Sequence, residues 1–428
     1  MKRPFFVFAC LACGLLATQP SLAAGALRFV NPDGGCGGAT PCYPDLQSAI
    51  NASSPGDVIG VQAAVYNLTA TVLVDRPVEI YGPQTGVNPL PSKGTTRVPG
   101  SAAEAVFDGG STLATLIRIL ADNVLIDGIE VRNGTGDLIE SVAGTPTSGT
   151  RIRNSIIHDS SGDEGVQLRA VTGAAIECNH VYATVGDGLN LCCGSTDGVI
   201  RANEVHACAS ENAAIYVYGA VGTLVEGNLV YDTTTNEGIK LGSKQGEDAG
   251  NAGGVIFNNT TRNTAQDGIA IYMSHTSASC NDVSGSTSEN GAIYVAWGVS
   301  SVSVTDNYVH DNILNPIKWG NPAGIMIGAD PDAATVTVSG NRLVNNTPNG
   351  ITNRAIARLV AENNWWGAPD GPGPVGSGSG DDVSANVDYD PWLGSPPAPI
   401  CPPVGTCPGD NPTPSKATSW GRLKTLFR

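Results

Sequence analysis

Two stretches of the chain decide the fold: IRNSIIHDSSGDEGVQL at residues 152–168 and IECNHVYATVGDGLNL at residues 176–191. Each begins with apolar residues around a small polar residue, passes through a polar turn, and ends on the pattern Gly-apolar-x-apolar. Self-similarity at a period of about 24 residues is typical of a solenoid, in which each repeat packs against its neighbours. Further copies occupy residues 199–217, 224–241 and 255–271, with weaker ones around Val295 and Ile327.

One polar position recurs once per repeat. A side-chain amide there can bond the equivalent amide one coil away, across the strand spacing of about 4.8 Å. The two short alternating segments of each copy then stack on those of the next copy as parallel sheets with their apolar residues inward. The sequence predicts an all-β right-handed parallel β-helix. The polar position is filled, at intervals of 22 to 34 residues, by Ser155, Asn179, Asn203, Asn228, Asn259, Asn281, Asn307, Asn341 and Asn363.

The flanking segments define four regions. Residues 1–24 carry Lys2 and Arg3, an apolar run and small residues near Ala23, a pattern typical of a signal peptide, so we expect a secreted protein. Residues 25–394 are predicted to form the β-helix, with a short amphipathic helix in PDLQSAINAS (44–53) capping the first coil. Residues 395–415 are rich in Pro, Gly and Ser and are interpreted as a linker. Residues 416–428 form a basic-aromatic tail, either an attachment signal or a frayed end.

Charge and hydropathy exclude several classes of partner. Removing the leader leaves 21 basic against 39 acidic residues, which argues against nucleic acid or an anionic membrane surface. Gly, Asn and Asp interrupt every later apolar run, so no transmembrane segment is predicted. Cations and extended polysaccharides are the expected partners.

The cysteines are expected to be structural. Cys36 with Cys42, and Cys401 with Cys407, are each spaced to close a small local loop in an oxidising compartment. The mature chain has an odd number of cysteines, so at least one thiol stays free and is expected to be buried. The repeat region holds Cys178, Cys192, Cys193, Cys208 and Cys280, for which a metal cluster is not expected because their repeat phases differ.

Both ends of the repeat region resemble a known superfamily. The segments LQSAI (46–50) and PGDVI (55–59) look like the opening of bacterial pectate-lyase-like β-helix proteins. The segments NNWWG (363–367) and VDYDPWL (387–393) look like their closing turns. The resemblance covers roughly residues 27 to 394 and implies the fold. It does not imply one activity, because this fold hosts lyases, hydrolases, epimerases, adhesins and structural fibres.

The second strand of each repeat supplies a column of outward residues suited to an extended polymer. We predict that this strip binds polysaccharide through Gln167, Tyr216 and Tyr294, with Trp297 beside it. The column is predicted to contain Gln167, Asn190, Tyr216, Lys240, Ala270, Tyr294 and Met326.

A second column, of acidic residues and Asn, lies just before these strands. Asp163, Glu164, Asp187 and Asn190 are the candidate ligands of Ca²⁺, because oxygen-only ligands of mixed charge suit that ion. Ordinary turn chemistry is the alternative interpretation of the same residues. Asp163 and Glu164 are adjacent, so in a strand their side chains would point to opposite faces, which makes them a poor acid/base pair.

Lys240 is the candidate catalytic residue. A lysine in its amine form can remove the proton next to a uronate carboxylate, and the resulting β-elimination is the polysaccharide lyase reaction. GDGLN (186–190) resembles the calcium-binding turn of Ca²⁺-dependent pectate lyases, and GIKLG (238–242) resembles their base segment. Gly186 and Asn190 replace two aspartates of that family, and Lys240 falls two coils after the turn. A salt bridge to Glu237 or Glu211 is the alternative role.

Three functions remain open on these residues. The first is Ca²⁺-assisted cleavage of an acidic polysaccharide, supported by the strip, the acidic column and Lys240. The second is a non-catalytic surface or matrix protein, adhesin-like, that binds glycans. The third is a uronate epimerase, which begins by removing the same proton.

Overall fold

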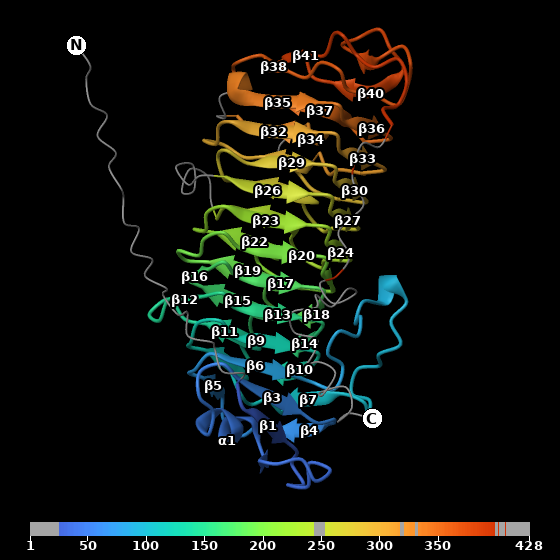
Figure 1. Ribbon diagram of the computed structural model, residues 1–428. Helices are drawn as coiled ribbons and strands as arrows, with labels where there is room; N and C mark the ends of the chain where they lie inside the picture. Colours follow the sequence, from blue (N-terminus) through green and yellow to red (C-terminus); the bar gives the residue numbers. More distant parts are fainter. Residues whose placement is uncertain are drawn as a thin grey trace, which may run out of the picture.

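The computed structural model describes residues 25–243, 253–316, 321–329, 333–398, 401 and 407. The chain winds into an elongated solenoid in which most coils contribute one strand to each of three long parallel sheets (Figure 1). The predicted all-β parallel β-helix with a short N-terminal helix is therefore confirmed. Among the described residues, no helix is long and apolar enough to cross a membrane.

Sheet A runs the length of the solenoid along one face. Its 15 described strands, in spatial order, are β2 (Cys42–Tyr43), β1 (Leu27–Val30), β3 (Asp57–Val61), β6 (Val78–Tyr81), β9 (Leu125–Asp127), β13 (Arg151–Arg153), β17 (Ala175–Glu177), β20 (Val199–Arg201), β23 (Thr223–Glu226), β26 (Gly254–Phe257), β29 (Ser277–Ser279), β32 (Val302–Thr305), β35 (Val336–Ser339), β38 (Leu359–Val360) and β41 (Val387–Asp388).

Sheet B follows sheet A in each coil. Its 11 described strands are β4 (Ala64–Asn67), β7 (Ala105–Asp108), β10 (Glu130–Gly134), β14 (Ile156–Ser160), β18 (His180–Thr184), β21 (Glu204–His206), β24 (Leu229–Tyr231), β27 (Thr260–Arg262), β30 (Asp282–Ser284), β33 (Tyr308–His310) and β36 (Arg342–Val344).

Sheet C completes each coil. Its 13 described strands are β5 (Val72–Val74), β8 (Ile117–Ile119), β11 (Ile139–Ser141), β15 (Val166–Arg169), β19 (Leu189–Cys192), β22 (Ala213–Tyr218), β25 (Glu237–Leu241), β28 (Ile269–Ile271), β31 (Gly291–Val295), β34 (Ala323–Ile327), β37 (Asn349–Asn353), β40 (Gly380–Val383) and β39 (Pro372–Pro374). The remaining elements are the small sheet of β12 (Thr147–Ser148) and β16 (Val171–Thr172), helix α1 (Leu46–Asn51), and the 3₁₀ turns η1 (Pro91–Lys93) and η2 (Ala333–Thr335).

Each coil holds three strands where the sequence pattern predicted two. The residue before the recurrent polar position adopts a left-handed conformation, as in Cys178 at φ 58° and Asp306 at φ 58°. This bend separates the sheet A strand from the sheet B strand, so the first apolar segment of each repeat divides into two. Inward residues of all three sheets, such as Ile152, Ile157 and Val166, are fully buried and form one continuous core.

The recurrent amides form a ladder along the solenoid axis. Asn228 is typical: its Nδ2 donates to the Ile200 carbonyl and to Asn259 Oδ1, both at 2.9 Å. Its Oδ1 accepts from the backbone N–H and the Nδ2 of Asn203, at 2.9 and 3.0 Å. The ladder ends on Asn364, not on Asn363 as the spacing predicted, because Asn363 occupies the left-handed bend at φ 60°.

The amphipathic segment at residues 44–53 forms a helix that covers the first coil. Helix α1 begins after Asp45, whose side chain accepts from the Ser48 backbone N–H at 2.7 Å. Its apolar face buries Leu46, Ala49 and Ile50 at the end of the core, as the periodicity predicted.

The disulfides differ from the sequence prediction at the C-terminal end. Cys36–Cys42 closes the expected local loop, and Cys208 is the buried free thiol among the described cysteines. Cys401 and Cys407 do not pair with each other. They bond to two cysteines of the repeat region, as Cys280–Cys401 and Cys178–Cys407, and Cys192 pairs with its neighbour Cys193.

The two long-range bonds correct two interpretations. Cys178 and Cys280 share one repeat phase, since each occupies the left-handed bend before a ladder amide. Cys178 and Cys280 are separated by four strand steps of sheet A, or about 19 Å. Six residue steps, from Cys401 to Cys407, can span at most about 20–22 Å, so one short segment is long enough to reach both cysteines. The region interpreted as a linker is therefore bonded back along the solenoid. Residues 1–24, predicted to be a signal peptide, and the basic-aromatic tail at residues 416–428 lie outside the described residues.

Candidate functional site

The predicted column of outward residues is in register on sheet C. Strand pairing aligns Gln167 with Asn190, Tyr216 and Lys240 on successive strands, and continues through Ala270, Tyr294 and Met326. We call these seven residues the sheet C strip. The strip is less open than predicted, since none of its residues is more than 8% exposed. Neighbouring members cover one another at the strand spacing, and residues of the preceding turns lean over them.

On three strands of the strip, an acid lies three residues ahead of a polar strip residue and bonds to it. Gln167 Nε2 donates to Glu164 Oε1 at 2.9 Å, and Asn190 Nδ2 donates to Asp187 Oδ2 at 2.7 Å. Two coils further on, Lys240 Nζ donates to Glu237 Oε1 at 3.3 Å. The recurrent Asp or Glu is therefore more than a turn former, because it fixes the polar end of a strip residue.

Three carboxylates converge at the first of these turns. Side-chain oxygens of Asp137, Asp163 and Glu164 all lie within 4.8 Å of one another, and we call these residues the acidic cluster. Asp163 and Glu164 precede strand β15 and lie in its turn, so they escape the strand alternation that would send their side chains to opposite faces. Asp163 is exposed, whereas its two partners are buried.

Burial controls the ionisation of the acidic cluster. Burial, followed by hydrogen bonds with Asp163 and Asp137 and by the negative charge of Asp137, raises the pKa of Glu164 far above its ordinary range. Burial also raises the pKa of Asp137, with the charge of Asp163 acting in the same direction. Three carboxylates this close cannot all ionise without a compensating positive charge.

Two amide oxygens at this position have no partner. Gln167 Oε1 and Asn190 Oδ1 are buried and accept no hydrogen bond, whereas Glu164 Oε2 accepts none but, when protonated, faces the carboxylates of Asp163 and Asp137. Each amide is held by its nitrogen on the acid of its own turn, which leaves the oxygen free. Carboxylate and amide oxygens together form the donor set that Ca²⁺ prefers, and a cation would satisfy the buried acceptors and the clustered charges at once.

Asp187, a predicted calcium ligand, has other partners. Its Oδ1 accepts from the Ser210 hydroxyl and from the Ala213 backbone N–H, and its Oδ2 accepts from Asn190. Burial raises its pKa to about 6, while the bonds from Ser210 and Asn190 oppose that rise. Asp187 is therefore satisfied by Asn190 of its own coil and by Ser210 and Ala213 of the next coil.

Lys240 lies in an aromatic and acidic pocket of the strip. Its Nζ is 5.6 Å from the ring centroid of Tyr216 and 5.0 Å from that of Tyr272, in addition to its ion pair with Glu237. Asp267 is buried nearby, and burial together with the charge of Glu237 raises its pKa to about 8. The salt bridge considered as an alternative role for Lys240 is present.

The predicted aromatic platform continues past Lys240. Tyr294 packs edge-on against Tyr272, with ring centroids 5.8 Å apart, and Trp297 follows in the turn after β31. Gly328 makes this packing possible, because a Cβ there would come within 2.7 Å of Trp297 Cδ1. Tyr294 is nearly fully buried, whereas Trp297 is half-buried.

The acidic cluster and Lys240 are separate sites on one strip. Three strand steps lie between Gln167 and Lys240, about 14 Å along the axis. Sequence reasoning missed Asp137, which stands in the turn Gly136-Asp137 one coil before Gly162-Asp163, and this repeated Gly-Asp pair was the signal for it. It also missed Arg169, which bonds Glu140 at 3.0 Å and lies 3.5 Å from Asp137.

Comparisons with known proteins agree with the fold. The family described as right handed beta helix region matches residues 110–247. The DFA-IIIase of Arthrobacter chlorophenolicus A6 without its lid aligns at 13% identity over 85% of this chain and 99% of that chain, with a TM-score of 0.54. The A-module of mannuronan C-5 epimerase AlgE6 of Azotobacter vinelandii aligns at 12% identity over 82% and 93%, with a TM-score of 0.52.

Pectate lyase Pel9A aligns at 13% identity over 75% of this chain and 80% of that chain, with a TM-score of 0.45. No protein with a curated description matches the sequence. The chain therefore has a right-handed parallel β-helix fold, like these solved structures.

Proposed function

We propose that the protein is exported and binds an extended acidic polysaccharide along the sheet C strip, with Ca²⁺ held by the acidic cluster. The observation that carries this proposal is the convergence of Asp137, Asp163 and Glu164 beside the free amide oxygens of Gln167 and Asn190. Sugar units lying along the axis would meet coils that repeat every ~4.8 Å. The fold neighbour named as a mannuronan C-5 epimerase agrees with a substrate of this class.

A bound cation would determine whether the strip attracts or repels an acidic ligand. Without it, the strongly acidic chain repels a polyuronate. When bound, Ca²⁺ supplies the positive charge that a uronate carboxylate requires at this point of the strip. The half-buried Trp297 offers apolar surface to the sugar rings further along the axis.

The catalytic form of the proposal is β-elimination with Lys240 as the base. The amine form of Lys240 takes the proton from the carbon next to a uronate carboxylate. The electron pair of the broken C–H bond forms the new carbon–carbon double bond, while the glycosidic C–O bond at the next carbon breaks and its oxygen takes a proton from solvent. Because Lys240 lies about 14 Å from the acidic cluster, the cation and the base act on different sugars of one polymer.

One assay tests the catalytic form. The protein is incubated with pectin, or with alginate, in the presence of Ca²⁺, and the unsaturated ends are followed by ultraviolet absorbance. We expect absorbance to rise with the wild type and with Lys93→Ala, whose exposed lysine lies on a distant turn, and not with Lys240→Ala. Full activity of Lys240→Ala would refute the assigned base.

The ion pair between Lys240 and Glu237 favours a second candidate function, which is glycan binding without turnover. In that case calorimetry would give Ca²⁺-dependent binding of polyuronate without any rise in absorbance. A uronate epimerase would instead change the ratio of the two uronate epimers, measured by proton NMR, without producing unsaturated ends.

A further inference from the structure

The C-terminal segment covers part of the turn between sheets A and B. The Cys280–Cys401 disulfide joins the segment to the bend after strand β29. Pro397 and Ala398 lie over the same turns. These turns connect sheets A and B, whereas the strip lies on sheet C. Together the disulfide, Pro397 and Ala398 close a cavity of about 240 Å³ on the outside of three successive coils. Its lining consists of Cys280, Asn281, Asp282, Asp306, Asn307, Tyr308, Gly340, Arg342, Pro397, Ala398 and Cys401.

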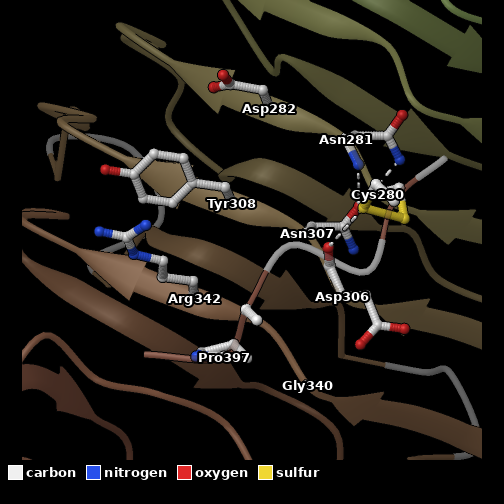
Figure 2. A pocket seen from close by; sticks show the side chains of 11 residues that line it. Cys280, Asn281, Asp282, Asp306, Asn307, Tyr308, Gly340, Arg342 and Pro397 are labelled. Atoms are coloured by element: carbon white, nitrogen blue, oxygen red, sulfur yellow. Dashed lines mark hydrogen bonds between the residues drawn. A yellow bond between two sulfur atoms is a disulfide. The ribbon is translucent and has the colours of Figure 1, made fainter. Parts of the chain in front are cut away.

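The cavity has one polar side and one apolar side. Figure 2 shows the side chains of Tyr308 and Arg342 on one side and the Cys280 disulfide on the other. Pro397 and Ala398 add apolar surface to the lining. The disulfide is thus a wall of the cavity as well as the bond that holds the covering segment in place.

Arg342 is the cation of this cavity. Its guanidinium carbon lies 4.4 Å from the ring centroid of Tyr308, and its Nε is buried without a hydrogen-bond partner. Strand pairing places Tyr308 between Asp282 and Arg342, so the ring separates the two charged groups. Stacking on Tyr308 orients the guanidinium plane and leaves its N–H groups available to an acceptor.

Two of the nearby acids, Asp282 and Asp311, are engaged by His310. Asp282 Oδ1 bonds His310 Nε2 at 3.0 Å, and Asp311 Oδ2 bonds His310 Nδ1 at 2.7 Å. The hydrogen bond with Asp282 is the largest cause of a raised pKa of His310, and the bond with Asp311 acts in the same direction. The cationic form of His310 is therefore favoured beside Asp282. Asp306 turns over Gly340, where a Cβ would meet its Oδ1 at 2.3 Å. Tyr308 stacks on His310 with ring centroids 3.9 Å apart, which completes the polar side.

We propose that this cavity binds a small carboxylate with an apolar body, and that it exists only while Cys280 and Cys401 are bonded. The ligand carboxylate accepts from the Arg342 guanidinium, and its apolar body lies against the disulfide, Pro397 and Ala398. The site is independent of the polysaccharide strip and of the cation proposed there.

Isothermal titration tests the ligand chemistry with benzoate and galacturonate, each beside its uncharged counterpart, benzamide and galactose. We expect benzoate to bind more tightly than galacturonate, whose body is polar, and benzamide to bind at least about tenfold more weakly than benzoate, because hydrogen bonds to a charged group are lost. Which carboxylate binds more tightly tells an aromatic ligand from a sugar acid. Arg342→Gln should weaken binding by a similar factor, whereas Arg358→Gln, at an exposed arginine paired with Asp388, should not.

The two disulfides of the C-terminal segment supply the matched control for the cavity itself. The double variant Cys280→Ser/Cys401→Ser removes the wall and should abolish binding, while Cys178→Ser/Cys407→Ser keeps it and should bind as the wild type does. Circular dichroism of both variants checks that the solenoid is intact. Equal binding of benzoate and benzamide, unchanged binding by Arg342→Gln, or binding by a folded Cys280→Ser/Cys401→Ser protein would overturn the proposal.

Discussion

Calcium binding to the acidic cluster should release about one proton from the protein at neutral pH. Burial and the neighbouring carboxylates keep Glu164 protonated there, since its pKa is raised far above neutrality. A cation bound to the cluster displaces that proton. Apparent affinity should therefore rise by about tenfold for each unit of pH, as long as Glu164 is protonated in the free protein.

The assay is isothermal titration with CaCl₂ at pH 7 in Tris and in HEPES, whose protonation heats differ. The difference between the two observed heats gives the number of protons released. Glu164→Gln keeps an oxygen at the same position but has no proton to lose, so we expect weaker binding without any dependence on the buffer. Asp187→Asn, at an acid satisfied by Ser210, should release the same proton as the wild type. Equal heats in the two buffers for the wild type would mean that Ca²⁺ binding releases no proton. That result would refute the reasoning from the raised pKa of Glu164.

Three further outcomes follow from buried groups. Asn228→Ala removes four buried hydrogen bonds of the ladder and should lower the free energy of unfolding in urea by about 3 kcal/mol, against less than about 0.5 kcal/mol for the exposed Asn51→Ala. Burial raises the pKa of Asp267 to about 8, so the folded protein binds this proton more tightly than the unfolded chain does and loses stability as pH rises. Asp267→Asn removes this titration. The unfolding midpoint of the variant should therefore fall less between about pH 6 and 8 than that of the wild type. Peptide mapping without reductant should recover Cys407 joined to Cys178, and recovery of a Cys401–Cys407 loop would contradict the assigned pairing.

The repeat allowed the architecture and the register of the strip to be predicted from the sequence. Ladder amides such as Asn179 recur at one position of the repeat, and outward residues such as Lys240 recur at another. The position within the repeat is enough to fix the face on which a residue lies. The bend before each amide could not be read in this way, because residues as different as Cys178 and Asp306 adopt the same left-handed backbone there. The third strand of each coil was missed for that reason.

The candidate site was predicted only in part, for a similar reason. The column of acids was visible, but whether Asp163 and Glu164 point apart or together depends on a turn geometry that alternation rules do not describe. Partners far apart in the chain, such as Arg169 with Asp137, follow from the stacking of coils. The covering of the strip residues depends on side-chain directions, and the pairing of Cys407 with Cys178 depends on the path of the C-terminal segment.

The Cys178–Cys407 bond changes how the molecule would carry a mechanical load. If the tail at residues 416–428 attaches the protein to a surface, a pull on the bound polymer passes from the tail through Cys407 into the coil of Cys178. Coils between Cys178 and the bound polymer carry that load, and the Cys280–Cys401 bond offers a second route into the solenoid. The coils on the far side of the polymer lie outside the path. The load therefore enters the solenoid near its middle, one or two coils from the acidic cluster, and not at its C-terminal end.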